Sequence, residues 1–355
     1  MKKLSIKKRS NKPANKSQIP SRITNETVAE HRERILAGGR RFKYPIQYSR
    51  HKLVINTIAI GVGTIIVLTA LVWWLLYYAQ NTSDVLYRIT KVVPASVARI
   101  DGHSVRYSDY LSYYRSSMHY IVSKEQQEFD AGGLKNQQDI IKSRSYDLAI
   151  RDGYAQIVAK DKGITVSDDE LDKFVDLQRK TSGSSVSDKT YDSVIMDYYG
   201  WSPDEYRHVL KDQLLRKKVE FAIDGTAMEL RDQVQAAIGK TKNPNFDKIA
   251  KGIKDLNGVK VVSSTSGLVP KYNQKDGGLS QAAGSLEVGD VSDAIKSTNG
   301  DGYYFVMLTD EKKDQLSYDY IKIPLTEFDK QLQQLKDEGR LKAYIDIPDS
   351  TPHNN

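Results

Sequence analysis

One stretch of the chain is apolar throughout, whereas apolar and polar positions alternate in the rest. From Leu53 to Ala79 the sequence has 27 residues without a charged side chain. A helix of this length is about 40 Å long, which exceeds the ~30 Å hydrocarbon layer of a bilayer. Trp73 and Trp74 lie near one end, where aromatic rings favour the headgroup region. We therefore expect one transmembrane helix, in contact with the lipid bilayer, over residues 53–79.

The charge distribution predicts how this helix is oriented. Residues 1–52 contain 15 Lys and Arg but only 3 Asp and Glu, although the whole chain has a net charge of only +8. Positively charged flanks stay in the cytoplasm. We expect a single-pass protein of the cell membrane with a cytoplasmic N-terminus and extracytoplasmic residues 80–355.

Two roles are open for the basic arm, residues 1–52. It is either a topology signal or a segment attracted to a polyanion, which is anionic lipid or nucleic acid. A nucleic-acid partner is not expected, because the positive charge is confined to this arm. Within it, a short helix is predicted from Glu26 to Leu36, ended by Gly38 and Gly39.

Helical periodicity dominates the region after a linker at residues 80–94. A short strand around Val97 is followed by an Asp101–Gly102 turn and a helix that begins at Ser108. Further helices end at Gly163 and Gly200, and capping boxes begin at Ser167 and Ser202. Residues 95–224 are therefore expected to form a mainly helical domain.

A tyrosine-rich stripe marks the first of these helices. It contains Tyr110, Tyr113, Tyr114 and Met118, together with Leu111 and Ile121. Tyrosine can bury its ring and keep its hydroxyl hydrated, so such a stripe either packs in a core or forms a recognition surface. We take these four side chains as candidate substrate-binding residues.

The pattern changes to mixed helix and strand after Gly225. Apolar residues recur at helical spacing from Phe246 to Leu256, and β-branched or aromatic runs at 259–265, 302–309 and 316–325 predict strands. Residues 225–325 are expected to form a small α+β domain. A polar amphipathic helix is predicted from Thr326 to Tyr344, within a C-terminal helix and tail at 326–355.

Residues 95–223 resemble the N-terminal region of SurA- and PrsA-type extracytoplasmic foldases. The resemblance is carried by VARIDGHSVRYSDYL, GITVSDDELDKFV and GWSPDEYRHVLKDQLLRKKV, in this order. It implies a chaperone domain that holds unfolded or newly exported polypeptides.

Residues 246–308 resemble part of a parvulin-type peptidyl-prolyl isomerase domain. The resemblance is carried by FDKIAKG, DGGLSQAAGSLEVGDVSDAIKS and GDGYYFVML. Tyr304 stands where the family has a strand histidine, and Tyr320 is the nearest counterpart of a second histidine, so we expect the strands around these tyrosines to be adjacent. Their hydroxyls are the candidate catalytic groups, and the resemblance implies a partly emptied apolar pocket near Leu268 and Leu279.

The chemistry of the sequence narrows the function further. Without cysteine, the chain has no disulfides or thiol catalysis. The histidines share no ligand spacing, and no GKS/T loop is present, so no metal, cofactor or nucleotide is expected.

The sequence therefore predicts a membrane-anchored α+β protein with one transmembrane helix, a mainly helical chaperone-like domain and a small parvulin-like α+β domain. We expect a tethered foldase that is an isomerase only if Tyr304 or Tyr320 acts. The alternative is a non-catalytic envelope scaffold that docks one fixed protein partner.

Overall fold

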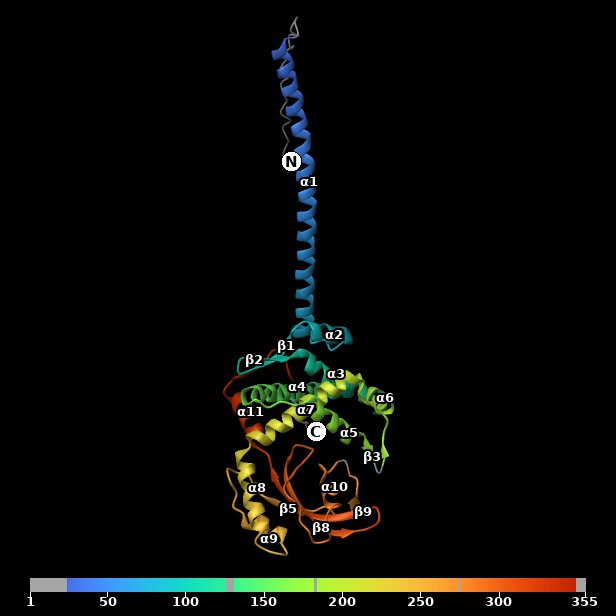
Figure 1. The fold of residues 1–355 in the computed structure, drawn as a ribbon, viewed down its shortest axis with the longest axis vertical. Coiled ribbons are helices and arrows are strands. Elements are labelled where there is room, and N and C mark those ends of the chain that lie inside the picture. Colours follow the sequence, from blue (N-terminus) through green and yellow to red (C-terminus); the bar gives the residue numbers. More distant parts are fainter. Residues whose placement is uncertain (1–23, 126–130, 182–183, 274, 349–355) are drawn as a thin grey trace. The chain divides into compact units, whose positions relative to one another are not determined.

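The computed structural model describes residues 24–125, 131–181, 184–273 and 275–348 (Figure 1). The chain divides into two compact units, Met1–Val72 and Trp73–Asn355. The C-terminal residues TPHNN, predicted as a frayed tail, lie outside the described residues.

A single long helix, α1 (Asn25–Trp73), accounts for the described part of the first unit. It passes through Gly38 and Gly39, so the prediction of a short helix ended by these glycines is wrong. A glycine inside a helix costs only about 1 kcal/mol, and helix-forming residues flank this pair. His51–Tyr78 is long and apolar enough to cross a membrane, in agreement with the expected span.

The second unit begins with the π-helical turn η1 (Trp74–Tyr78) and continues into a helical domain. A three-stranded antiparallel sheet and six helices make up most of this domain (Figure 1). The helices are α2 (Asp84–Val92), α3 (Tyr107–Tyr120), α4 (Ala131–Lys162), α5 (Asp168–Arg179), α6 (Asp188–Tyr199) and α7 (Pro203–Ile223), with a π-helical turn η2 (Ile121–Glu125) after α3. Two strands of the sheet are β1 (Ser96–Ile100) and β2 (His103–Arg106), and the C-terminal segment supplies the third. Separately, β3 (Lys180–Thr181) pairs with β4 (Ser184–Ser185).

Most of the predicted helix ends of this domain are confirmed. The Ser202 side chain accepts a hydrogen bond from the Glu205 amide while the Glu205 carboxylate accepts one from the Ser202 amide, which is the expected capping box. The expectation that residues 80–94 form only a linker is wrong, because they contain α2. The side chains of Leu86, Tyr87 and Thr90 on one face of α2 are buried, which stabilises a helix that its sequence alone does not predict.

A buried ionic network joins α3, α4 and α7. The Tyr113 hydroxyl donates to Asp152 Oδ2 at 2.5 Å, and Arg216 forms an ion pair with the same carboxylate. Burial raises the pKa of Asp152 against the opposing effect of Arg216. Arg216 and Arg151 also approach Glu220, at 3.9 and 3.2 Å. These contacts fix the three helices relative to one another.

A small α+β domain follows α7, as predicted. Its helices are α8 (Gly225–Ile238), α9 (Phe246–Gly252) and α10 (Leu279–Ala283), and its strands are β5 (Val262–Thr265), β6 (Val269–Pro270), β7 (Ile295–Lys296), β8 (Gly302–Glu311) and β9 (Gln315–Pro324). The strand order is β5-β9-β8-β7, with β6 also paired to β9, and all pairs are antiparallel. Val306 pairs with Tyr320 and Tyr304 with Lys322, so the strands around the two candidate tyrosines are adjacent, as expected.

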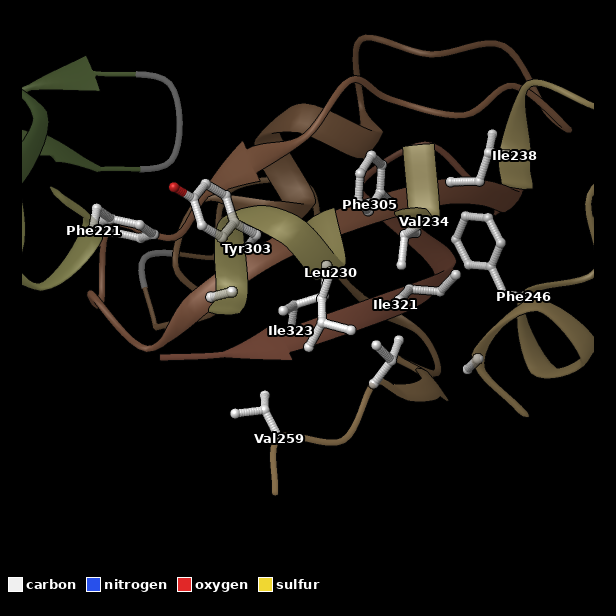
Figure 2. Close-up of a cluster of buried hydrophobic side chains, with 13 residues drawn as sticks. Phe221, Leu230, Val234, Ile238, Phe246, Val259, Tyr303, Phe305, Ile321 and Ile323 are labelled. Atoms are coloured by element: carbon white, nitrogen blue, oxygen red, sulfur yellow. The ribbon is translucent and has the colours of Figure 1, made fainter. Parts of the chain in front are cut away.

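The two faces of this sheet carry separate cores. Leu230 and Val234 of α8 and Phe246 of α9 pack on one face, against Phe305, Ile321 and Ile323 (Figure 2). On the other face, Leu279 and Ala283 of α10 pack against Tyr304, Val306 and Tyr318. Both faces are therefore covered within the domain.

The C-terminal segment returns to the helical domain. After α11 (Glu327–Asp337), strand β10 (Leu341–Ala343) pairs with β1 in the order β10-β1-β2. The predicted helix to Tyr344 is therefore too long. Gly339, with φ of +68°, lies just past the end of α11 in a left-handed conformation that favours glycine and redirects the chain.

Asp224 joins the two points at which the chain enters and leaves the small domain. Its side chain is fully buried, and Oδ1 accepts a hydrogen bond from the Ala227 amide, at 2.8 Å, at the start of α8. Oδ2 accepts hydrogen bonds from the amides of Thr326, at 2.7 Å, and Glu327, at 3.0 Å, at the start of α11. The small domain is thus inserted into the helical domain, and one carboxylate holds both connections.

Candidate functional site

Two hollows of the helical domain lie where the end of α3 and η2 meet α6. One cavity, of about 510 Å³, is lined by side chains that include Tyr114, Met118, Val122 and Trp201. A second, of about 820 Å³, is lined by Met196 of α6 and by side chains that include Asp188, Asp192 and Asp197. His119 and Ser123 line both cavities, so the two adjoin. We call the combined hollow the α3–α6 groove.

The walls of this groove hold exposed apolar side chains. Val122 is 68% exposed and Met196 is 49% exposed. Tyr199 stacks on Trp201 with ring centroids 5.2 Å apart, and the Trp201 indole nitrogen donates to Ser112 Oγ at 3.1 Å. The aromatic wall is therefore held rigidly while its outer ring remains accessible.

Gly200 permits the close approach of α3 to the end of α6. Its φ is +66°, and a Cβ at this position would lie 3.0 Å from His119 Cγ. The His119 ring in turn lies with Nε2 3.0 Å from the Asp197 carbonyl oxygen. The glycine that ends α6 therefore also sets the width of the groove between the two helices.

The groove suits the binding of apolar chain segments. Its volume and mixed apolar and polar lining are typical of ligand sites. Two of its wall residues, Met118 and Met196, have flexible side chains that adapt to different shapes. Among the described residues, no cluster of three or more His, Asp or Glu side chains could hold a metal ion.

The structure separates the predicted substrate-binding residues into two sets. Tyr114 and Met118 line the groove. All three tyrosines are buried. Tyr110 and Tyr113 are not among the residues that line the groove, and the Tyr113 hydroxyl is bonded to Asp152, so neither side chain is open to a client in this structure. Both fill the space between α3 and its neighbours, which is the packing role left open for the stripe.

The remaining predicted residues belong to the small domain. Leu268 is 49% exposed, but Leu279, the first residue of α10, is buried against β8 and β9, so the two do not form an open pocket in this structure. The Tyr304 and Tyr320 rings approach with centroids 5.8 Å apart, and the Tyr304 hydroxyl donates to Asp301 Oδ2 at 2.6 Å.

The environment of Tyr304 keeps its hydroxyl protonated. Burial and the neighbouring Asp301 carboxylate raise the pKa of Tyr304. Burial also acts to raise the pKa of Asp301, but hydrogen bonds from Lys322 and Tyr304 outweigh it and lower that pKa. Tyr304 is therefore a hydrogen-bond donor already engaged by an ionised carboxylate.

Sequence reasoning missed several groove residues. Val122, Met196, Tyr199 and Trp201 were not among the predicted binding residues. Trp201 precedes the capping box at Ser202, and a large aromatic residue between two predicted helices is a signal that could have drawn attention to it. The exposure of Val122, Met196 and Tyr199 depends on how η2 and α6 pack against the rest of the domain, which the sequence pattern does not reveal.

Comparison with known families supports the resemblance of the helical domain to a SurA-like chaperone domain. Residues 47–220 match the family model of the SurA-like N-terminal domain. The match supports a SurA-like chaperone domain and includes both the apolar helix and the α3–α6 groove. It does not extend to the small domain, and no curated protein matches the chain.

Proposed function

We propose that this protein is a membrane-tethered extracytoplasmic chaperone that holds unfolded or newly exported polypeptides in the α3–α6 groove. The observation that carries the proposal is the presence of this groove within the stretch that matches the SurA-like N-terminal domain. Exposed Val122 and Met196 would take up apolar side chains of a client, and a shallow groove of this kind favours weak, reversible binding.

The tether is supported by the apolar helix and by the charge before it. His51–Tyr78 meets the length and composition of a span, and residues 1–52 are strongly basic. A tethered groove has a high effective concentration for chains that emerge at the same membrane. The same charge distribution supports the proposal that the second unit lies on the extracytoplasmic side.

A topology experiment tests the tether directly. Because the chain has no cysteine, Asp169→Cys and Asn25→Cys each introduce one thiol. A membrane-impermeant maleimide added to intact cells should label the thiol at position 169 and leave that at position 25 unlabelled until the cells are opened. The reverse pattern would refute the assignment.

A holding assay tests the chaperone function. The full chain in lipid nanodiscs should suppress the aggregation of several unrelated unfolded proteins. A double variant with Val122→Ser and Met196→Ser should lose most of this protection, whereas Val288→Ser, which changes a 63% exposed residue of the small domain, should retain it. Protection of no substrate would favour a scaffold with one fixed partner.

We also propose that the small domain is a parvulin-like module with little isomerase activity. Adjacent β8 and β9 place Tyr304 and Tyr320 together, but the Tyr304 hydroxyl is engaged by Asp301. Isomerisation has a barrier of roughly 18–20 kcal/mol, and a catalyst needs an apolar seat for the proline ring. A proline-isomerisation assay on the full chain, beside Tyr304→Phe and Tyr320→Phe, should give a rate near background in all three proteins.

A further inference from the structure

The outward face of α2 is apolar and basic. Val85 is 66% exposed and Val92 is 85% exposed, while Leu86 and Tyr87 on the opposite face are buried in the helical domain. Residues 85, 88 and 92 fall on one side of a helix, and Arg88 is exposed there. An exposed apolar stripe with a cation is unusual for a helix that faces only water.

The short connection before α2 keeps this stripe within reach of the end of the candidate membrane span. Five residues, 79–83, separate the end of η1 from the start of α2. A chain of this length reaches at most about 20 Å, even when fully extended. Tyr78 is 77% exposed and Trp74 is also exposed, and such rings favour the interface between lipid and water.

We propose that the Val85–Arg88–Val92 face of α2 lies in the headgroup layer of the outer leaflet, with Arg88 paired to anionic lipid phosphate. The inference rests on the proposed tether, since it needs α1 and η1 to cross the bilayer. Interfacial helices of this type bury an apolar face about 5–10 Å into the boundary between headgroups and acyl chains.

Such docking would also position the α3–α6 groove. Thr82 and Asp84 line one of its two cavities, and Asp84 at the start of α2 forms a 2.6 Å ion pair with Arg115 of α3. The docked helix would therefore hold that end of the groove close to the bilayer surface, where exported chains emerge.

Spin labelling of the full chain in vesicles tests the inference. Single nitroxides are attached at Val92→Cys, at Ile60→Cys within the candidate span and at Asp169→Cys as an exposed control on α5. Vesicles contain phosphatidylcholine with or without phosphatidylglycerol. The label at position 92 should collide with oxygen, relative to a water-soluble nickel chelate, several-fold more often than the label at position 169. Arg88→Glu should reduce this difference in the anionic vesicles only.

The three labels separate the outcomes. A lipid-exposed label at position 60 with a water-exposed label at position 92 would overturn the docking of α2 and leave the tether intact. A water-exposed label at position 60 would overturn both. Equal behaviour of Arg88→Glu in the two kinds of vesicle would overturn the pairing of Arg88 with anionic lipid.

Discussion

Replacement of Asp224 by alanine should destabilise the second unit more than any change at its surface. The carboxylate is fully buried and accepts three backbone hydrogen bonds, from the amides of Ala227, Thr326 and Glu327. Alanine offers no acceptor, so all three amides lose their hydrogen-bond partner.

The expected loss follows from these three bonds. Removal of an aspartate N-cap costs about 1 kcal/mol, which applies to the start of α8. Each amide left without a partner in a buried position costs about 1–3 kcal/mol, and the amides of Thr326 and Glu327 are only partly buried, so the lower value applies. The free energy of unfolding should therefore fall by about 3 kcal/mol.

Denaturant unfolding of the full chain in detergent micelles, followed by circular dichroism, measures this loss. Asp255→Ala is the matched control, because that side chain is exposed in the loop after α9, and it should change the free energy of unfolding by less than about 0.5 kcal/mol. A loss below about 1 kcal/mol for Asp224→Ala would refute the reasoning, since it is no larger than that of a single exposed cap.

Three further changes test other parts of the fold. A chain that stops after Glu338 lacks β10, so the amides of β1 should lose hydrogen-exchange protection, and unchanged protection would contradict the observed pairing. Burial raises the pKa of Asp212 to about 6, so the folded state binds its proton more tightly and the free energy of unfolding should fall as the pH rises from about 4 to about 6. Asp212→Asn should flatten this slope in urea titrations and raise the stability at pH 7 by on the order of 1 kcal/mol; a slope equal to that of the original protein would disprove the assignment. Ser202→Ala should cost about 1 kcal/mol in the same titrations because it removes the cap of α7, and a neutral result would show that the cap is replaced by water.

Local signals in the sequence predicted much of the helical domain. The capping boxes at Ser167 and Ser202 and the glycines after α4 and α6 are short-range patterns whose physical effect does not depend on distant residues. Strands β8 and β9 were also predicted from a local signal, since a dense run of β-branched and aromatic residues favours a strand.

Features that depend on distant partners were missed. Strand β10 is three residues long and is stabilised by β1, and α2 is stabilised by the residues buried beneath it. The same limit applies to the candidate site. Periodicity identified the stripe from Tyr110 to Met118, but only the packing of α4, α6 and α7 determines that Tyr113 is internal while Met118 lines the groove.

The pairing of β10 with β1 has a consequence for how the protein reaches its mature form. Asp101, at the tip of the β1–β2 turn, is bound by Arg340, 239 positions further along the chain. During synthesis, β1 and β2 thus emerge long before the strand that completes their sheet, and the free edge of β1 stays unpaired until the chain has been made past Arg340. A newly made copy of this protein is therefore itself an incompletely folded chain, with the same need for protection that it is proposed to meet in others.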